Sequence, residues 1–154
     1  MNNQTKASQL PDNILELDGL QQMKLAFEDG AKRPPIGETL DFGLIEMEKG
    51  KVVFEGHPAE KHMNPIGSIH GGYAATLLDS ALGCSVHTLL EPGERYTTVD
   101  LNVKYVRAMR PGMGPVYCTG VVVHKGRKIA TADAKIVDAD GKLYAHGSTT
   151  CVIL

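Results

Sequence analysis

The chain has 154 residues, of which 42% are hydrophobic and 22% are charged, and its formal net charge is −2. This length fits one domain that can bury about two thirds of the surface of its unfolded chain. The slightly acidic charge removes the usual electrostatic basis for a dedicated nucleic-acid binder, whose affinity depends on neutralising phosphates.

The three cysteines are widely spaced and form no CxxC pair, so we expect reduced core thiols, no metal site and no cofactor. The amino-terminal residues contain no apolar run, and no segment reaches the roughly 18 apolar residues that cross a bilayer. Together these features predict a cytoplasmic protein without a membrane partner.

Residues 1–35 are expected to form an arm and one short helix, ahead of a main domain at residues 36–154. The arm is polar and offers little apolar surface to offset the entropy of ordering. From Asp18 the apolar residues have helical spacing, and we expect Gly30 and Pro34-Pro35 to end this helix.

The main domain is expected to open with a hairpin and to contain one long helix. Residues 40–48 and 51–56 have strand character around a turn at Lys49-Gly50, and a loop follows over 57–69. From 70 to 90 the chain lacks proline and is densely apolar, which predicts a buried helix.

The remainder of the chain has strand character. Strands are predicted at 96–106, 116–124, 128–138 and 142–153, and tight turns make the last three antiparallel neighbours. Small residues alternate with polar ones from Ala130 to Ile136, which indicates a face against which a helix can pack closely. Two strands, one buried helix and four antiparallel strands predict an α+β fold.

One carboxylate interrupts the predicted long helix. Asp79 lies on a narrow stripe of small or polar residues formed by Gly72, Thr76, Ser80, Gly83 and His87. Burial raises the pKa of a carboxylate and produces a base that works near neutral pH. The spacing leaves two interpretations open, because Asp79 could equally be solvated on the edge of the helix or bind a partner subunit's backbone.

The start of the same helix could hold a developing oxyanion. At Gly71 and Gly72 a ligand can approach the backbone closely, and the first N–H groups of a helix lack internal partners. A tight entry from loop to helix would explain the same glycines. Asp79 lies about 10–12 Å further along the axis, so both groups can reach one carbonyl only from different subunits of a symmetric dimer.

The run from Asn64 to Asp79, NPIGSIHGGYAATLLD, resembles the signature of hot-dog-fold acyl-CoA thioesterases of the PaaI type, and the resemblance extends over residues 37–154. It implies an antiparallel sheet wrapped around one long central helix. It also implies hydrolysis of acyl-CoA to free acid and coenzyme A, by homodimers that often build tetramers.

The resemblance further implies a role for each residue of the signature. Gly71 is similar to the backbone donor that polarises the thioester carbonyl, and Asn64 to its side-chain assistant. Asp79, from the partner subunit, is similar to a general base or nucleophile. His70 resembles the residue that orients the loop near the thioester sulfur, and Thr98, or the adjacent Thr97, resembles the residue that places the attacking water.

Between Leu101 and Ala132 the chain carries six basic residues and no acidic one. Such a local surplus can hold the phosphates of coenzyme A although the whole chain is acidic. The residues expected to bind substrate or coenzyme A are Gly72, Arg107, Lys125, Arg127 and Lys128. These charges could alternatively keep solvated turns and strand edges soluble.

Other chemistries fit the residues less well. Cys84 and His87 are three apart on the helix but project in different directions, and the loop histidines His57, His62 and His70 lack the spacing of a zinc site. A hot-dog hydratase or dehydratase, and a non-catalytic acyl-CoA-binding protein, remain alternatives. Hydrolysis of a saturated acyl-CoA would distinguish a thioesterase from both.

Overall fold

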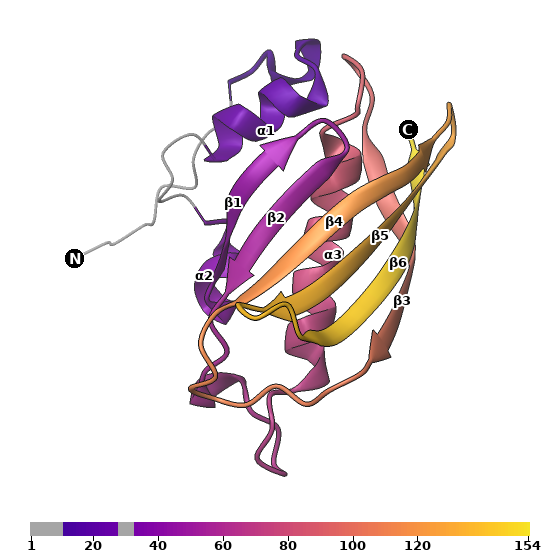
Figure 1. The fold of residues 1–154 in the computed structure, drawn as a ribbon. Coiled ribbons are helices and arrows are strands. Elements are labelled where there is room, and N and C mark those ends of the chain that lie inside the picture. Colours follow the sequence, from indigo (N-terminus) through magenta and orange to yellow (C-terminus); the bar gives the residue numbers. More distant parts are fainter. Residues whose placement is uncertain (1–10, 28–32) are drawn as a thin grey trace, which may run out of the picture.

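The computed structural model describes residues 11–27 and 33–154. Six strands form one antiparallel sheet in the order β1-β2-β4-β5-β6-β3, which curves around helix α3 (Figure 1). The strands are β1 (Phe42–Glu48), β2 (Lys51–Gly56), β3 (Tyr96–Tyr105), β4 (Val116–Lys125), β5 (Ile129–Asp138) and β6 (Leu143–Ile153). The helices are α1 (Gly19–Phe27), α2 (Pro35–Leu40) and α3 (Gly71–His87), with 3-10 turns at Ile14–Glu16 and Glu60–His62. The predicted hairpin, long helix and four later strands are confirmed.

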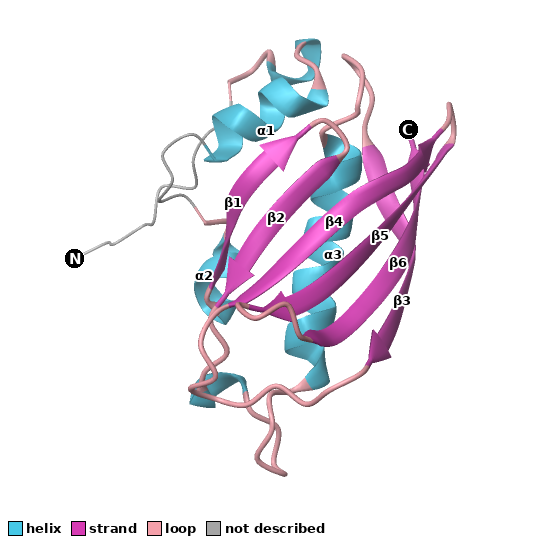
Figure 2. Ribbon diagram, in the orientation of Figure 1, coloured by secondary structure: helices cyan, strands magenta, loops and turns pink. Residues whose placement is uncertain are grey.

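Helix α3 lies against the inner face of the sheet and supplies the centre of the core (Figure 2). Its fully buried apolar side chains include Leu77, Leu78, Ala81, Leu82 and Val86. The small residues of β5 face this helix, since Ala130, Ala132 and Ala134 are buried while the residues between them are more exposed. On β4, a Cβ at Gly120 would lie 2.3 Å from the carbonyl oxygen of Ala81, so only glycine allows this close packing.

The carboxyl end of α3 is held by contacts from two other segments, the β1–β2 turn and α1. The Gly50 N–H in the β1–β2 turn donates to Thr88 Oγ1 at 2.8 Å, and the Gly19 N–H of α1 donates to the Leu90 carbonyl at 2.8 Å. The Gln22 side chain of α1 contacts His87 Nε2 at 2.9 Å. These contacts fix the direction of α3, so its amino end lies at the opposite end of the sheet, close to where β3 ends (Figure 1).

One element differs from the sequence prediction. Pro34-Pro35 was expected to end a helix, but Pro35 instead occupies the first position of α2, where its missing N–H costs no hydrogen bond. Asp41 ends α2 in a left-handed conformation, with φ of 57°. The predicted helix stop at Gly30 and most of the predicted arm lie outside the described residues.

Candidate active site

The amino end of α3 exposes a backbone donor. His70 caps the helix, because its Nδ1 accepts a hydrogen bond from the Gly72 N–H at 2.8 Å and its carbonyl accepts one from the Tyr73 N–H at 3.0 Å. Among the hydrogen bonds of residues 11–27 and 33–154, none is donated by the Gly71 N–H. Gly71 therefore offers the unpaired donor that the sequence predicts, whereas the N–H of Gly72 is occupied by the cap.

Neighbouring side chains leave little room for a side chain at either glycine. The Tyr105 hydroxyl donates to the Gly71 carbonyl at 2.8 Å, and a Cβ on Gly71 would lie 3.0 Å from that hydroxyl oxygen. A Cβ on Gly72 would lie 2.9 Å from His70 Nδ1. Close packing thus accounts for small residues at both positions. Tyr105 was not predicted from the sequence, where its only signal is an aromatic residue at the end of a predicted strand.

Asn64 organises the loop that leads into α3. Its Oδ1 accepts from the N–H groups of Ile66 and Ser68 at 3.1 and 3.3 Å, and its Nδ2 donates to Ser68 Oγ at 3.0 Å. The loop also contains Gly67 at φ 87°, a left-handed conformation that favours glycine. One of the two hydrogens on Nδ2 remains for another acceptor.

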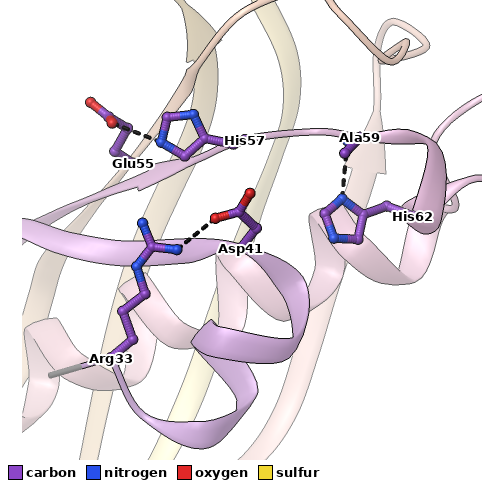
Figure 3. A network of polar contacts seen from close by, with 6 residues as sticks. All are labelled: Arg33, Asp41, Glu55, His57, Ala59 and His62. Atoms are coloured by element: carbon purple, nitrogen blue, oxygen red, sulfur yellow. Dashed lines mark hydrogen bonds and ion pairs between the residues drawn. The ribbon is translucent and has the colours of Figure 1, made fainter. Parts of the chain in front are cut away.

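A polar network supports the other end of this loop (Figure 3). His62 Nδ1 accepts a hydrogen bond from the Ala59 N–H at 3.1 Å, and His57 contacts Glu55 at 2.9 Å. Arg33 pairs with Asp41 at 2.6 Å, and hydrogen bonding to Arg33 holds the pKa of the Asp41 carboxyl below its usual value. His57 thus pairs with Glu55 of β2, and His62 with the backbone of Ala59 in the loop.

A cavity of about 460 Å³ opens at the amino end of α3. It is lined by residues 68–72 and Ala74, by residues 105–109 at and beyond the end of β3, and by Tyr144 and Ala145. His70, Gly71 and Arg107 therefore face one cavity. The Arg107 guanidinium lies 6.0 Å from the centre of the Tyr144 ring, a cation–π geometry that orients the charge.

Asp79 lies two turns further along α3, outside this cavity. The residue is exposed in the single chain, and its expected burial opposite a neighbouring subunit stays a prediction. Partial desolvation nevertheless raises the pKa of the Asp79 carboxyl, and a hydrogen bond with Thr98 opposes that rise. Asp79 is therefore a somewhat stronger base than a fully solvated aspartate.

The bulged start of β3 places Thr98 beside Asp79. Thr98 is half-buried, its hydroxyl lies 3.9 Å from Cys151 Sγ, and a register shift follows it in the pairing of β3 with β6. Thr97 is exposed, as expected for the opposite face of the strand. Of the two threonines, Thr98 is the one in contact with the carboxylate.

The predicted coenzyme A cations fall into two groups. Arg107 lies in the cavity at the amino end of α3, whereas Lys125, Arg127 and Lys128 lie in or beside the β4–β5 turn near the other end of α3 (Figure 1). Lys125 is paired with Glu94 at 2.7 Å. One chain alone therefore does not bring the predicted cations together.

The alternative chemistries find little support in the described part of the chain. Burial raises the pKa of the Cys84 thiol to about 12, and His87 is bonded to Gln22, so these two residues do not form a nucleophilic pair. Residues 11–27 and 33–154 contain no cluster of three potential metal ligands. No helix in these ranges is both long enough and apolar enough to cross a membrane.

A family model for the thioesterase superfamily matches residues 66–145, which include the helix start, Asp79 and most of the sheet. The chain belongs to the thioesterase superfamily. It is 34% identical over 112 residues to acyl-coenzyme A thioesterase 13 of Homo sapiens, a match that covers 70% of this chain and 76% of the human protein. It is 27% identical over 116 residues to 1,4-dihydroxy-2-naphthoyl-CoA hydrolase of Listeria monocytogenes, covering 75% and 93% of the two chains.

Solved structures agree with this family assignment. Zebrafish thioesterase superfamily member 2 superposes with a TM-score of 0.72 and 31% identity, covering 88% of this thioesterase and 98% of the zebrafish chain. The Escherichia coli PaaI protein superposes with a TM-score of 0.76 at 18% identity, covering 88% and 95%. The predicted hot-dog fold and the predicted resemblance to PaaI-type thioesterases are confirmed.

Proposed function

We propose that this thioesterase hydrolyses acyl-CoA to free acid and coenzyme A. The names of the human and Listeria relatives support a coenzyme A thioester as substrate. Within the chain, the supporting observation is the Gly71 N–H, an unpaired donor at the amino end of a 17-residue helix that faces a cavity. Such a donor stabilises the negative charge that develops on a carbonyl oxygen under attack.

Asp79 activates the attack on the thioester carbon. As a general base it takes a proton from water while the water oxygen bonds to the carbonyl carbon, and the Gly71 N–H binds the resulting oxyanion. The tetrahedral intermediate then collapses and breaks the carbon–sulfur bond, and the thiolate of coenzyme A takes up a proton. In the alternative path, the Asp79 carboxylate attacks the carbonyl carbon directly and displaces the thiolate of coenzyme A. Water then hydrolyses the resulting anhydride. This path needs Asp79 and the Gly71 N–H in the same positions.

The two groups must come from different chains. Gly71 and Asp79 are eight residues apart on α3, which is about 12 Å along the axis, too far for both to touch one carbonyl. A homodimer resolves this mismatch and covers the Asp79 that is exposed in one chain. Strand β3 supports such a dimer, because it forms an edge of the sheet and carries the exposed apolar residues Val99, Leu101 and Tyr105.

Three further residues support the reaction. Because His70 Nδ1 accepts from the Gly72 N–H, the proton of neutral His70 lies on Nε2, which can donate toward the leaving sulfur. Thr98 beside Asp79 helps place the attacking water. Asn64 holds the loop before α3, and its remaining Nδ2 hydrogen can join Gly71 at the oxyanion.

We also propose a cytoplasmic location and, as a further step of assembly, a tetramer. The cytoplasmic location is supported by the three cysteines, all free, of which Cys118 and Cys151 are buried and Cys84 is half-buried. Gel filtration with light scattering would distinguish the dimer from the tetramer.

The proposal is tested by thiol release across a panel of saturated and aromatic acyl-CoAs. We expect wild-type protein to release coenzyme A and Asp79→Asn to lower kcat by about 10²–10⁴. Asp133→Asn, an exposed aspartate on the outer face of β5, is the matched control and should retain turnover. Full turnover by Asp79→Asn would contradict the proposal, and so would binding of acyl-CoA by the wild type without hydrolysis.

A further inference from the structure

The loop before α3 is closed at its base by backbone hydrogen bonds. The His70 N–H donates to the His62 carbonyl at 2.8 Å, and Met63 pairs with Ile69 in an isolated antiparallel bridge. His70 is the cap of α3, and Gly71 is the first residue of the helix. The His62 carbonyl therefore holds the residue that directly precedes the proposed oxyanion donor.

The side chain of His62 joins the same two segments a second time. Its ring is only 5% exposed, and its Nδ1 accepts a hydrogen bond from the Ala59 N–H at 3.1 Å (Figure 3). The centre of the ring lies 4.6 Å from the centre of the Tyr73 ring, in the first turn of α3, with the two planes 31° apart. His62 thus links the loop to the helix start through its backbone and through its ring.

A single hydrogen bond holds this buried ring. Among the buried side-chain atoms of residues 11–27 and 33–154, His62 Nε2 and the Tyr73 hydroxyl oxygen have no hydrogen-bond partner. Leaving buried polar atoms unpaired lowers stability, yet the ring occupies this place. Within the described residues, the orientation of the ring therefore depends on Nδ1 and the Ala59 N–H.

The ring can keep this bond only while it is neutral. Because Nδ1 accepts from the Ala59 N–H, the proton of the neutral ring lies on Nε2. A second proton would go to Nδ1 and would bring two N–H donors against each other. Tyr73 adds no charge on the α3 side, since burial raises the pKa of its hydroxyl.

The other groups around the ring have opposing effects on its charge. Burial and, after it, the positive charge of Lys61 lower the pKa of His62, whereas Asp41 and the Thr39 carbonyl act in the opposite direction. The charge of Asp41 is itself paired with Arg33 at 2.6 Å. The net result is a ring that stays neutral to lower pH than a solvated histidine.

We propose that His62 positions the Gly71 N–H for the thioester carbonyl, and that it does so only while its ring is neutral. The Ala59 N–H fixes the ring, and the His62 carbonyl then fixes His70. This inference rests on the proposed function. Because the oxyanion forms in the transition state, a misplaced donor lowers kcat and leaves the KM unchanged.

Two uncharged replacements separate the acceptor at Nδ1 from the rest of the ring. The Oδ1 of asparagine can take the place of Nδ1, whereas the amide of glutamine reaches the place of Nε2. We expect His62→Gln to lower kcat by about 10–10²-fold and His62→Asn by no more than about threefold, with the KM unchanged in both. His146→Asn, on the exposed face of β6, is the control.

NMR spectroscopy of the wild-type protein tests the same link without a substitution and without turnover. The ring nitrogens of His62 should show an unprotonated Nδ1 near neutral pH. On acidification, the Gly71 amide signal should move with the same midpoint as the His62 ring, and His62→Asn should lose this transition. The ring signals of His70 identify any contribution from the helix cap itself.

Four results would overturn the proposal: an equal loss of kcat in His62→Gln and His62→Asn, no loss in either, a change in KM in place of kcat, or a Gly71 amide signal that does not follow His62. Failure of the proposed function gives a different result. In that case Asp79→Asn retains turnover, while the amide signal still reports whether His62 sets the position of Gly71.

Discussion

The Tyr105 hydroxyl donates a 2.8 Å hydrogen bond to the carbonyl oxygen of Gly71, and so ties the last residue of the edge strand β3 to the first residue of α3. The same peptide region carries the unpaired N–H that we assign to the oxyanion. The edge strand thereby sets the position of the proposed oxyanion donor.

Removing this hydroxyl tests the link between the edge strand and catalysis. We expect Tyr105→Phe to lower the free energy of unfolding by about 0.5–1.5 kcal/mol and kcat by several-fold, because the helix start loses its anchor. Urea unfolding and thiol release measure the two effects. Tyr117→Phe, on the half-buried β4 position, is the control, and an unchanged kcat in Tyr105→Phe would mean that the bond is only structural.

The pH dependence of hydrolysis should respond to Thr98. Its hydrogen bond lowers the pKa of the Asp79 carboxyl by stabilising the charged form, so Thr98→Val should raise that pKa. Because the reaction requires ionised Asp79, the acid limb of the kcat/KM profile should move to higher pH. Thr97→Val, on the exposed side of the strand, should leave the limb in place. If Thr98→Val and Thr97→Val gave the same pH profile of kcat/KM, Thr98 would have no role in the reaction.

Asp79 should also reduce stability at neutral pH. Desolvation raises the pKa of its carboxyl above the unfolded value, so the folded state binds the proton more tightly. The resulting stability is complete below the unfolded pKa and is lost as the pH rises through the folded pKa. Asp79→Asn should therefore have a higher Tm than wild type at pH 7, and the difference should shrink as the pH falls toward about 3.

Calorimetry at several pH values measures this difference. A constant Tm difference across the range would show that the carboxylate bears no cost of desolvation. Asp133→Asn, exposed on β5, provides the comparison for a change of charge alone.

In the proposed dimer, Gly71 of one chain lies level with Asp79 of the other, so the two-fold axis passes midway between these residues and places the two copies of Ala75 opposite each other. Ala75 is half-buried in the single chain, so its side chain is accessible to a partner. We expect Ala75→Cys to form an intersubunit disulfide under mild oxidation, visible as a dimer on non-reducing gels. Ala139→Cys, in the exposed β5–β6 turn, should not do so. Absence of the cross-link at position 75 would argue against this arrangement of the helices.

Much of the fold could be predicted from sequence because its elements have clear local signals. The proline-free apolar run before His87 and the alternation from Ala130 to Ile136 both correspond to buried elements of the fold. Helix α2 was missed because a pair of prolines such as Pro34-Pro35 also commonly ends a helix. A proline at the first helical position is compatible with a helix, and only the residues that follow distinguish the two cases.

The site was only partly predictable. His70, Gly71 and Asp79 lie within ten residues on one element, so helical geometry alone gave their separation. The cations of Arg107 and the β4–β5 turn were grouped in sequence but lie at opposite ends of α3, because antiparallel strands return the chain to alternate ends of the sheet. Burial of Asp79 could not be judged from one chain, since in the proposed dimer it depends on a second subunit.

Complementation between two inactive variants tests the central claim, that Gly71 of one chain works with Asp79 of the other. Gly71→Pro removes the backbone N–H at the first position of α3, a position that accepts proline, so homodimers of Gly71→Pro and of Asp79→Asn should each be nearly inactive. A heterodimer of the two contains one site with intact Gly71 and intact Asp79, so we predict that it recovers about half of the wild-type kcat per dimer. A heterodimer that stays as inactive as its parents would contradict the account, because it would place both residues of each site on a single chain.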